Sequence, residues 1–275
     1  MSGFLEEMAR SSAERVSRAL ARESVEALAR RARQVLPAPP LRLSTSGFDV
    51  IAELKLRSPA AGVLKDASHD WRDRVERYAR AGAAAVSVLT EPSRFDGSLD
   101  HLTEAARALA PLGVPAMRKD FIVDPYQVLE ARAAGAGGML VIVRMLSRER
   151  IEELLRAAAE QGLFVLLEAF DAGDLALAGL LQRQFAAAPA PVLVGLNCRD
   201  LDTLAVDRTR FAALAAQLPA GSTAVAESGV ATAADAREMR RLGYRAALIG
   251  TALMRAEKPE VLLREILTAG RTAGV

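Results

Sequence analysis

The sequence predicts an α/β protein built as a (β/α)₈ TIM barrel with an N-terminal helical extension. Eight short apolar runs rich in valine and isoleucine alternate strictly with eight segments of helical period. This alternation is typical of parallel strands joined by helical crossovers. The eight units fill about 230 residues, close to the ~250 residues usual for a closed barrel. An open doubly wound sheet is the alternative, but no G-x-G-x-x-G loop follows any predicted strand.

The first 35 residues predict helix, because apolar side chains recur with a helical period among arginines and glutamates. This region ends at the LPAPP segment, residues 36–40, where proline stops a helix. We expect residues 1–47 to form an extension that caps the barrel. Residues 48–275 then form the barrel, and the whole chain is a single domain.

The barrel units follow in order along the chain. The predicted strands are 49–55, 84–90, 114–119, 138–143, 163–168, 191–197, 223–228 and 246–251. The predicted helices are 70–82, 98–110, 124–136, 147–162, 172–186, 207–218, 232–243 and 258–270. Several of these helices open with Ser, Thr or Asp as an N-cap and close at Gly, as helices commonly do.

Composition excludes several classes of protein. Thirty-six basic and thirty-four acidic side chains give a formal charge of +2, which provides no strong field for nucleic acid. No stretch approaches the ~20 apolar residues of a membrane helix, and the N-terminus lacks the apolar run of a secretory signal. The one cysteine, Cys198, cannot form an internal disulfide, and the two histidines are too isolated to suggest a metal site. We therefore expect a cytoplasmic protein without nucleic acid, membrane or metal partners.

Polar residues gather where the predicted strands end, which is where barrel enzymes carry their active sites. Two of the four lysines and three glutamates lie there: Lys55, Lys119, Glu53, Glu168 and Glu227. Internal ion pairs that tie the barrel together are the structural alternative. Because burying a charge costs several kcal/mol, five charged groups in otherwise apolar strands favour an active site.

Several ordered motifs at these strand ends resemble the indole-3-glycerol phosphate synthase family, from about Ile51 to Met254. They are IAELKLRSPAAGVL, SVLTEPSRFDGSLDHL, RKDFIVDPYQVLEARAAGAGGMLVIV, VGLNCRDLDTLAVD, VAESGV and LIGTALM. The resemblance implies a (β/α)₈ barrel enzyme of tryptophan biosynthesis that needs no cofactor. Its reaction closes the indole ring of 1-(2-carboxyphenylamino)-1-deoxyribulose 5-phosphate, with loss of carbon dioxide and water.

The resemblance also implies a role for each matching position. Lys119 corresponds to the principal general acid. The other catalytic positions are Glu53, Lys55, Glu168, Asn197 and Glu227. The positions that bind substrate are Ser58, Phe121, Arg199, Ser228, Gly229, Gly250 and Thr251. Within this second set Phe121 lies beside the ring, Arg199 serves the carboxylate, and the remainder serve the phosphate.

The chemistry of such a reaction agrees with these residue types. Joining an arene carbon to a ketone needs an acid at the carbonyl oxygen, and a lysine whose pKa is lowered by a second cation can serve. Lys55 and Lys119 are the candidate pair. The later dehydration needs a base and an acid, for which Glu168 and a lysine are the candidates. Which lysine acts there stays open.

The sequence also departs from the family pattern. Glu168 is followed by Ala169 and Phe170, where the family usually has a histidine-containing tripeptide, and the segment 171–192 is longer than usual. A paralogue that serves a secondary pathway is therefore open. Phosphoribosylanthranilate isomerase is an alternative that uses a cysteine after strand one, where this chain has Glu53 and Lys55. An inactive paralogue would be expected to have lost Lys119 or Glu168. A monomer is favoured for the oligomeric state.

Overall fold

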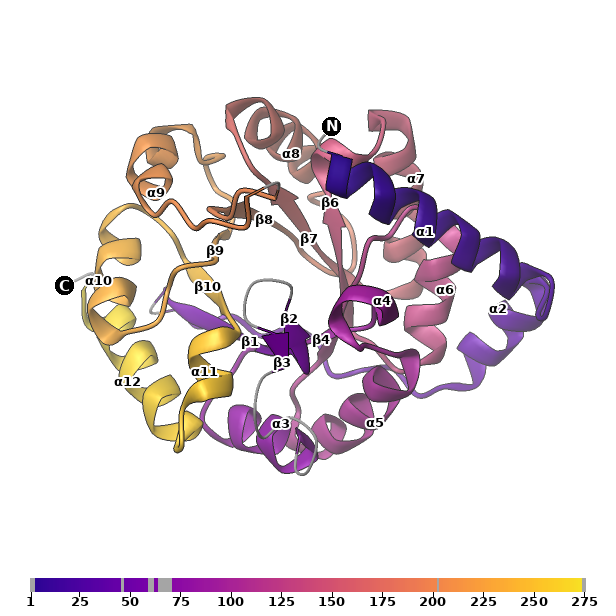
Figure 1. Ribbon diagram of the computed structural model, residues 1–275, viewed down its shortest axis with the longest axis horizontal. Helices are drawn as coiled ribbons and strands as arrows, with labels where there is room; N and C mark the ends of the chain where they lie inside the picture. The colour runs from indigo at the N-terminus through magenta and orange to yellow at the C-terminus, as the bar shows by residue number, and fades with distance from the viewer. Residues whose placement is uncertain (1–2, 46, 59–61, 64–70, 202, 274–275) are drawn as a thin grey trace.

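Eight parallel strands close into a barrel in the order β1-β10-β9-β8-β7-β6-β5-β4 (Figure 1). The computed structural model describes residues 3–45, 47–58, 62–63, 71–201 and 203–273, without the side chains of Ser58 and Val63. The strands are β1 (Asp49–Leu54), β4 (Ala85–Leu89), β5 (Ala116–Lys119), β6 (Gly138–Ile142), β7 (Phe164–Ala169), β8 (Val192–Asn197), β9 (Ala224–Glu227) and β10 (Ala246–Ile249). The predicted (β/α)₈ barrel is confirmed.

A ring of helices covers the outside of the barrel, one after each strand (Figure 1). They are α3 (Trp71–Arg80), α5 (Leu99–Leu109), α6 (Pro125–Ala133), α7 (Arg148–Gln161), α8 (Ala172–Gln184), α9 (Thr209–Leu214), α10 (Ala233–Arg241) and α12 (Pro259–Thr272). The predicted N-caps form: the side chains of Ser98, Asp124 and Thr232 each accept a hydrogen bond from the first turn of their helix.

The N-terminal region forms two helices, α1 (Gly3–Leu20) and α2 (Val25–Gln34). The break has a local cause, because the Ser24 hydroxyl accepts from the Ala27 amide and so starts a new helix. In Figure 1, α1 crosses the barrel at its edge and α2 lies beside α6. The division at residue 47 into extension and barrel stays a prediction, because side chains of α1 pack into the barrel's own core.

Three short features at the carboxyl ends of barrel strands, a two-stranded sheet and two helices, were not predicted from the sequence. The antiparallel pair β2 (Arg57–Ser58) and β3 (Gly62–Val63) follows β1, α4 (Pro92–Phe95) follows β4, and α11 (Thr251–Arg255) follows β10. All three come after the carboxyl end of a barrel strand. They therefore shape the same end of the molecule that carries the predicted site.

Successive strand residues face opposite sides of the sheet, and the barrel has two apolar cores as a result. Outward residues such as Val50 and Ala52 pack under the helices, whereas inward residues such as Ile51 and Met117 fill the barrel. Counting on by two from the inward residues leads to polar ones: from Ile51 to Glu53, and from Met117 to Lys119. The strand period therefore points these side chains into the mouth of the barrel.

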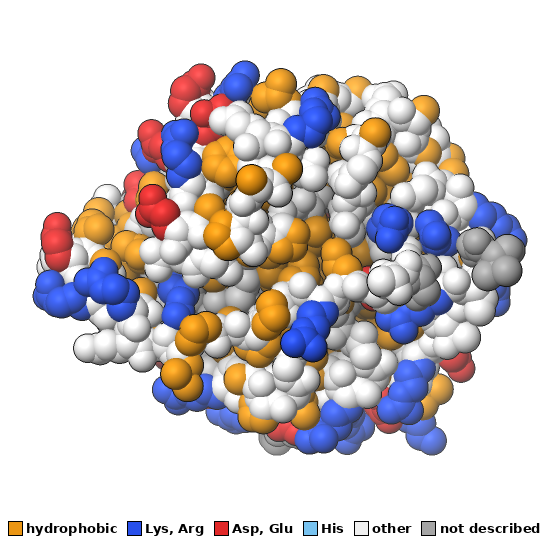
Figure 2. Space-filling view, turned by 180° about the vertical axis from the view of Figure 1, so that it is seen from behind, with side chains coloured by type: hydrophobic (Ala, Val, Ile, Leu, Met, Phe, Trp, Pro, Cys, Tyr) orange, Lys and Arg blue, Asp and Glu red, His pale blue; other side chains and the backbone are white. Residues whose placement is uncertain are grey.

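The opposite face of the molecule carries charges of both signs. Figure 2 shows basic and acidic side chains interspersed, mostly around the rim, with hydrophobic side chains between them. Among the described helices, none is both long and apolar enough to cross a membrane.

Candidate active site

A cavity of about 560 Å³ opens at the carboxyl ends of the barrel strands. Twelve of the thirteen residues predicted from the sequence line it: Glu53, Lys55, Lys119, Phe121, Glu168, Asn197, Arg199, Glu227, Ser228, Gly229, Gly250 and Thr251. The thirteenth is Ser58, whose side chain lies outside the described residues. The structure thus brings together residues spread over nearly 200 positions of sequence.

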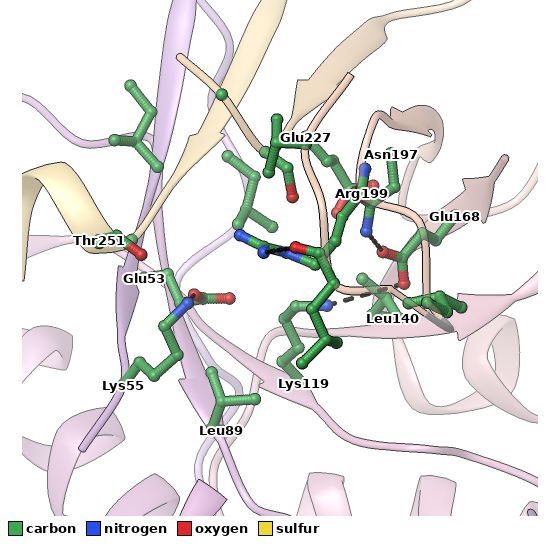
Figure 3. A pocket seen from close by; sticks show the side chains of 18 of the residues that line it. Glu53, Lys55, Leu89, Lys119, Leu140, Glu168, Asn197, Arg199, Glu227 and Thr251 are labelled. Atoms are coloured by element: carbon green, nitrogen blue, oxygen red, sulfur yellow. Dashed lines mark hydrogen bonds and ion pairs between the residues drawn. The ribbon is translucent and has the colours of Figure 1, made fainter. Parts of the chain in front are cut away.

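Two lysine–carboxylate pairs face each other across this cavity. Lys55 Nζ lies 2.8 Å from Glu53 Oε1, and Lys119 Nζ lies 3.7 Å from Glu168 Oε2. In Figure 3, Lys119 projects into the centre between the Glu53–Lys55 pair and Glu168. The side chain of Lys119 is 18% exposed and that of Glu168 is 3% exposed, so the ammonium group borders the cavity while its partner lies beneath.

Asn197 holds Glu168 from the other side. Its amide Nδ2 donates to Glu168 Oε1, and its Oδ1 accepts from the Arg199 backbone N–H at 2.9 Å. These two contacts fix which way the Asn197 amide points. Glu168 is therefore held between an amide and an ammonium, with its carboxylate aimed at the mouth of the barrel (Figure 3).

Arg199 stands at the edge of the cavity on a small hairpin after β8. Its backbone pairs with Val206, and its guanidinium Nη1 donates to the Leu204 carbonyl at 2.7 Å. One of its nitrogens is tethered in this way. Such a cation suits an anionic group of a ligand at the cavity edge.

Of the three glutamates Glu53, Glu168 and Glu227, Glu227 has the surroundings least suited to a negative charge. It is 1% exposed, and among the described residues neither of its oxygens has a hydrogen-bond partner. Burial raises its pKa well above the ordinary value, the nearby Glu168 raises it further, and Lys119 offsets only part of the increase. The arrangement favours a protonated Glu227, which can donate a hydrogen bond.

Lys119 corrects an expectation drawn from the sequence. A neighbouring cation was expected to lower its pKa, but the pKa of Lys119 is raised. Burial by itself lowers it, but the carboxyl groups of Glu168, Glu227 and Glu53 more than compensate. The cavity therefore favours the ammonium form of Lys119, which carries a proton.

Glu53 stays ionised for a related reason. Burial raises its pKa, but Lys55 and then Lys119 lower it by more, so the net shift is downward. An anionic Glu53, a cationic Lys119 and a neutral Glu227 thus lie side by side in the cavity. Acids and bases are kept in different protonation states in this way, a feature common at catalytic sites.

The opposite side of the mouth is built from two tight turns. Ser228 and Gly229 both have positive φ, at 65° and 87°, directly after β9. Gly250 and Thr251 lead from β10 into α11. Gly250 also leaves room for the Glu53 carboxylate, which a Cβ at that position would overlap. The sequence analysis missed this second requirement for Gly250.

An apolar wall completes the cavity on the side of Lys119. The Phe121 ring meets Phe4 edge-on at 5.9 Å and Phe95 at 6.4 Å, between ring centroids. Leu140, Ile142 and Phe170 continue this wall. Phe4 lies on α1, and the sequence analysis gave it only a place in the apolar stripe of the extension. Only the fold shows that it reaches the cavity.

The described residues contain no group of three or more His, Cys, Asp and Glu side chains arranged to hold a metal ion. Cys198 is fully buried beside Asn197, and burial raises the pKa of its thiol to about 12. It is a neutral side chain within the core.

A closed parallel barrel with a lysine–carboxylate cavity at its carboxyl end places the chain among the (β/α)₈-barrel enzymes. The sequence profile of the indole-3-glycerol phosphate synthase family matches residues 5–266. The chain belongs to this family.

Curated relatives carry the same family name. The indole-3-glycerol phosphate synthase of Rhizorhabdus wittichii is 39% identical over 227 residues, which cover 82% of this chain and 81% of the relative. Indole-3-glycerol phosphate synthase 2 of Streptomyces coelicolor is 41% identical over 237 residues, covering 84% and 86%.

Solved structures with lower identity share the fold. The 3-hexulose-6-phosphate synthase of Salmonella typhimurium matches with a TM-score of 0.61 at 14% identity, covering 82% of this chain and 99% of that one. The phosphoribosylanthranilate isomerase of Thermotoga maritima matches with a TM-score of 0.53 at 13% identity, covering 82% and 99%. At such identities the likeness extends to the barrel alone.

Proposed function

We propose that this chain catalyses the reaction of its family, the closure of 1-(2-carboxyphenylamino)-1-deoxyribulose 5-phosphate to indole-3-glycerol phosphate, with release of carbon dioxide and water. The observation that carries the proposal is the position of the Lys119 ammonium. It lies 3.7 Å from Glu168, borders the apolar wall and faces the Glu53–Lys55 pair. The reaction belongs to tryptophan biosynthesis and needs no cofactor.

The cavity offers a place for each part of the substrate. The aromatic ring packs on the wall around Phe121, because apolar and aromatic faces favour stacked or edge contacts. Arg199 at the cavity edge pairs with the ring carboxylate. The phosphate lies at the turns Ser228–Gly229 and Gly250–Thr251, where backbone N–H groups can approach its oxygens closely. Ser58 is a further phosphate contact in this proposal.

Ring closure begins with proton donation by Lys119. As the ring carbon that bears the carboxylate attacks the ketone carbon, the carbonyl oxygen takes a proton from the ammonium group. A carbon–carbon bond forms, and the oxygen becomes a hydroxyl group. Loss of carbon dioxide then returns the bonding electrons to the ring and restores its aromaticity. Glu53 and Lys55 hold Lys119 and the sugar hydroxyls in position from the opposite side.

Dehydration completes the indole. The hydroxyl group leaves as water after it takes a proton from a lysine, and Glu168 removes the proton from the adjacent sugar carbon. The protonated Glu227 donates a hydrogen bond to the reacting chain, and Asn197 keeps the Glu168 carboxylate aimed at it. Over the whole reaction one proton is taken up as the carboxylate leaves as carbon dioxide.

A fluorescence assay tests the proposal directly. The purified chain is mixed with the anilino substrate, and the indole product is followed by its own emission. Turnover that disappears in Glu168→Gln supports the proposal. Absence of turnover in wild type, together with isomerisation of phosphoribosylanthranilate, would assign the chain to the isomerase class.

Location and assembly are part of the same proposal. The cytoplasm suits a chain whose one cysteine is buried, because the fold then needs no oxidising compartment. A monomer is proposed for the oligomeric state. Sedimentation of the purified protein tests the second point, and a dimer would contradict it.

A further inference from the structure

We propose that α1 is a positioning element for the catalytic lysine, and that Arg15 and Ser12 on α1 hold the Lys119–Phe121 segment in place. The inference rests on the proposed function. It concerns residues on the N-terminal helix that touch neither of the two lysine–carboxylate pairs.

Asp120, the residue directly after Lys119, is the centre of the contact. Its side chain is fully buried, and Arg15 grips it with two hydrogen bonds of 2.9 and 2.7 Å. Its Oδ2 also accepts from Thr90 Oγ1 at 2.7 Å and from Arg118 Nη2 at 3.0 Å. A buried carboxylate held by two guanidinium groups is an anchored point of the backbone.

The backbone N–H and the backbone carbonyl of Phe121 both form hydrogen bonds within the same cluster. Its N–H donates to Asp120 Oδ1 at 2.8 Å, and its carbonyl accepts from the Ser12 hydroxyl. Gln127 at the start of α6 donates to that hydroxyl at 2.9 Å and completes the network. The strand end that carries Lys119 is therefore fixed on one side by the barrel and on the other by α1.

Apolar contacts reinforce the polar ones. Phe4 of α1 packs against the Phe121 ring, and Leu5 and Met8 are buried in the inner core of the barrel. One face of α1 thus presents a ring, a hydroxyl and a guanidinium to Asp120 and Phe121, the two residues that directly follow Lys119. Burial raises the pKa of Asp120, but Arg118 and Arg15 lower it by more, so the carboxylate keeps the charge that holds the segment.

This arrangement matters because Lys119 must meet a developing charge with little freedom of position. A misplacement of about 1 Å can reduce a rate by roughly 10²-fold. Thr90 and Arg118 hold Asp120 from the barrel, whereas Arg15 holds it from a helix more than 100 residues away in sequence. Loss of the contacts from α1 should loosen Lys119 without removing any group that touches substrate.

The test compares Arg15→Met with Glu7→Gln. Glu7 is also on α1 and pairs with Arg94 of α4 at 2.6 Å, but both side chains of that pair are exposed, at 44% and 46%. In Arg15→Met, Asp120 keeps Arg118 and Thr90 as partners, so the variant is expected to fold. We expect kcat to fall by roughly 10- to 100-fold with KM changed less than about threefold. Glu7→Gln should stay within about twofold of wild type, because exposed ion pairs contribute little.

A second readout separates this inference from the proposed function. Hydrogen–deuterium exchange of the peptide that contains Phe121 should become at least about tenfold faster in Arg15→Met and in Ser12→Ala, at equal global stability, since a local opening frees its amide. The same peptide should be unchanged in Glu7→Gln. Wild type that turns over no substrate would overturn the proposed function, while exchange would still decide the coupling. Unchanged exchange, or a lower Tm with an unchanged kcat, would overturn the positioning role.

Discussion

The carboxyl group of Glu227 lies in the space that Gly195 leaves by having no side chain, so that a Cβ on Gly195 would overlap Glu227 Oε1. The two residues are on neighbouring strands, β8 and β9, and both face the inside of the barrel. The glycine therefore sets where the neutral carboxyl group sits relative to Lys119 and Glu168. The sequence alone does not show that Glu227 requires a glycine at position 195.

Gly195→Ala should destabilise the protein by about 1–3 kcal/mol, because it overpacks a close-fitting interior. Most of this loss should disappear when Glu227 is also changed to Ala, since the overlapping atoms are then gone. Urea unfolding of the two single variants and the double variant gives the coupling energy. A coupling below about 0.5 kcal/mol, the scatter of independent sites, would show that the two residues do not compete for space.

Glu227→Gln should make the protein measurably more stable at pH 8 than wild type, because a carboxyl group whose pKa is raised by folding costs stability once the unfolded chain ionises. The pKa of Glu227 is higher in the folded than in the unfolded chain. Between those two values the folded chain binds one more proton, so wild type loses stability as the pH rises. Glutamine has no proton to lose.

Unfolding in urea at pH 5 and pH 8 measures this difference. The advantage of Glu227→Gln should shrink as the pH falls toward 4.5, because the unfolded chain then also takes up the proton that the folded chain already holds. The same advantage at both pH values would indicate that Glu227 is ionised in the folded protein.

Gly229→Ala should raise KM by roughly 10- to 100-fold, the value of about one hydrogen bond to a charged group. With φ at 87°, however, any side chain at Gly229 is strained, and a Cβ would lie 2.9 Å from Arg208 Cγ. The loss of stability in Gly229→Ala must therefore be compared with the loss caused by alanine at another glycine of similar φ.

Gly243 provides that match, because it has φ of 94° and open space where a Cβ would be. Gly243→Ala should lose a similar amount of stability, of order 1–2 kcal/mol, with an unchanged KM. Equal KM values in the two variants would place the phosphate away from this turn.

Activity should not depend on a divalent metal. The carboxylates of the cavity face lysines, and the Lys119 ammonium itself supplies the positive charge at the carbonyl oxygen. Dialysis against EDTA should leave kcat within about twofold of its starting value. Loss of activity that magnesium restores would contradict this prediction.

The barrel could be predicted because its strands and helices repeat with regular periods and capped ends. The inward series that ends in Glu53, Lys119 and Glu227 follows from the same period of two. The short elements α4 and α11 could not be predicted, since helices of four and five residues have no period to detect. They depend on caps and on contacts that only the closed barrel provides.

The contributions of α1 and the protonation states were also hidden from the sequence. Phe4 and Arg15 read as an apolar and a charged position of one amphipathic helix, although both contact residues that lie more than 100 positions away. The direction of the Lys119 pKa depends on how three carboxyl groups converge on one ammonium group. Spacing along the chain identifies these residues but not their distances.

The central claim is that Lys119 donates a proton, and Lys119→Arg tests it most directly. Arginine keeps the positive charge but holds its proton, since its pKa exceeds 12. Lys258→Arg is the matched control, because Lys258 is exposed at the start of α12 and does not line the cavity.

Steady-state turnover of the anilino substrate by the two variants, with binding of the product measured separately, is the decisive measurement. We expect Lys119→Arg to lose at least about a hundredfold in kcat while it still binds the product, within the 10²–10⁴ range of positioned acid catalysis. Lys258→Arg should match wild type. If Lys119→Arg turned over within a few-fold of wild type, Lys119 would serve only as an ion-pair residue, and the acid would have to be Lys55.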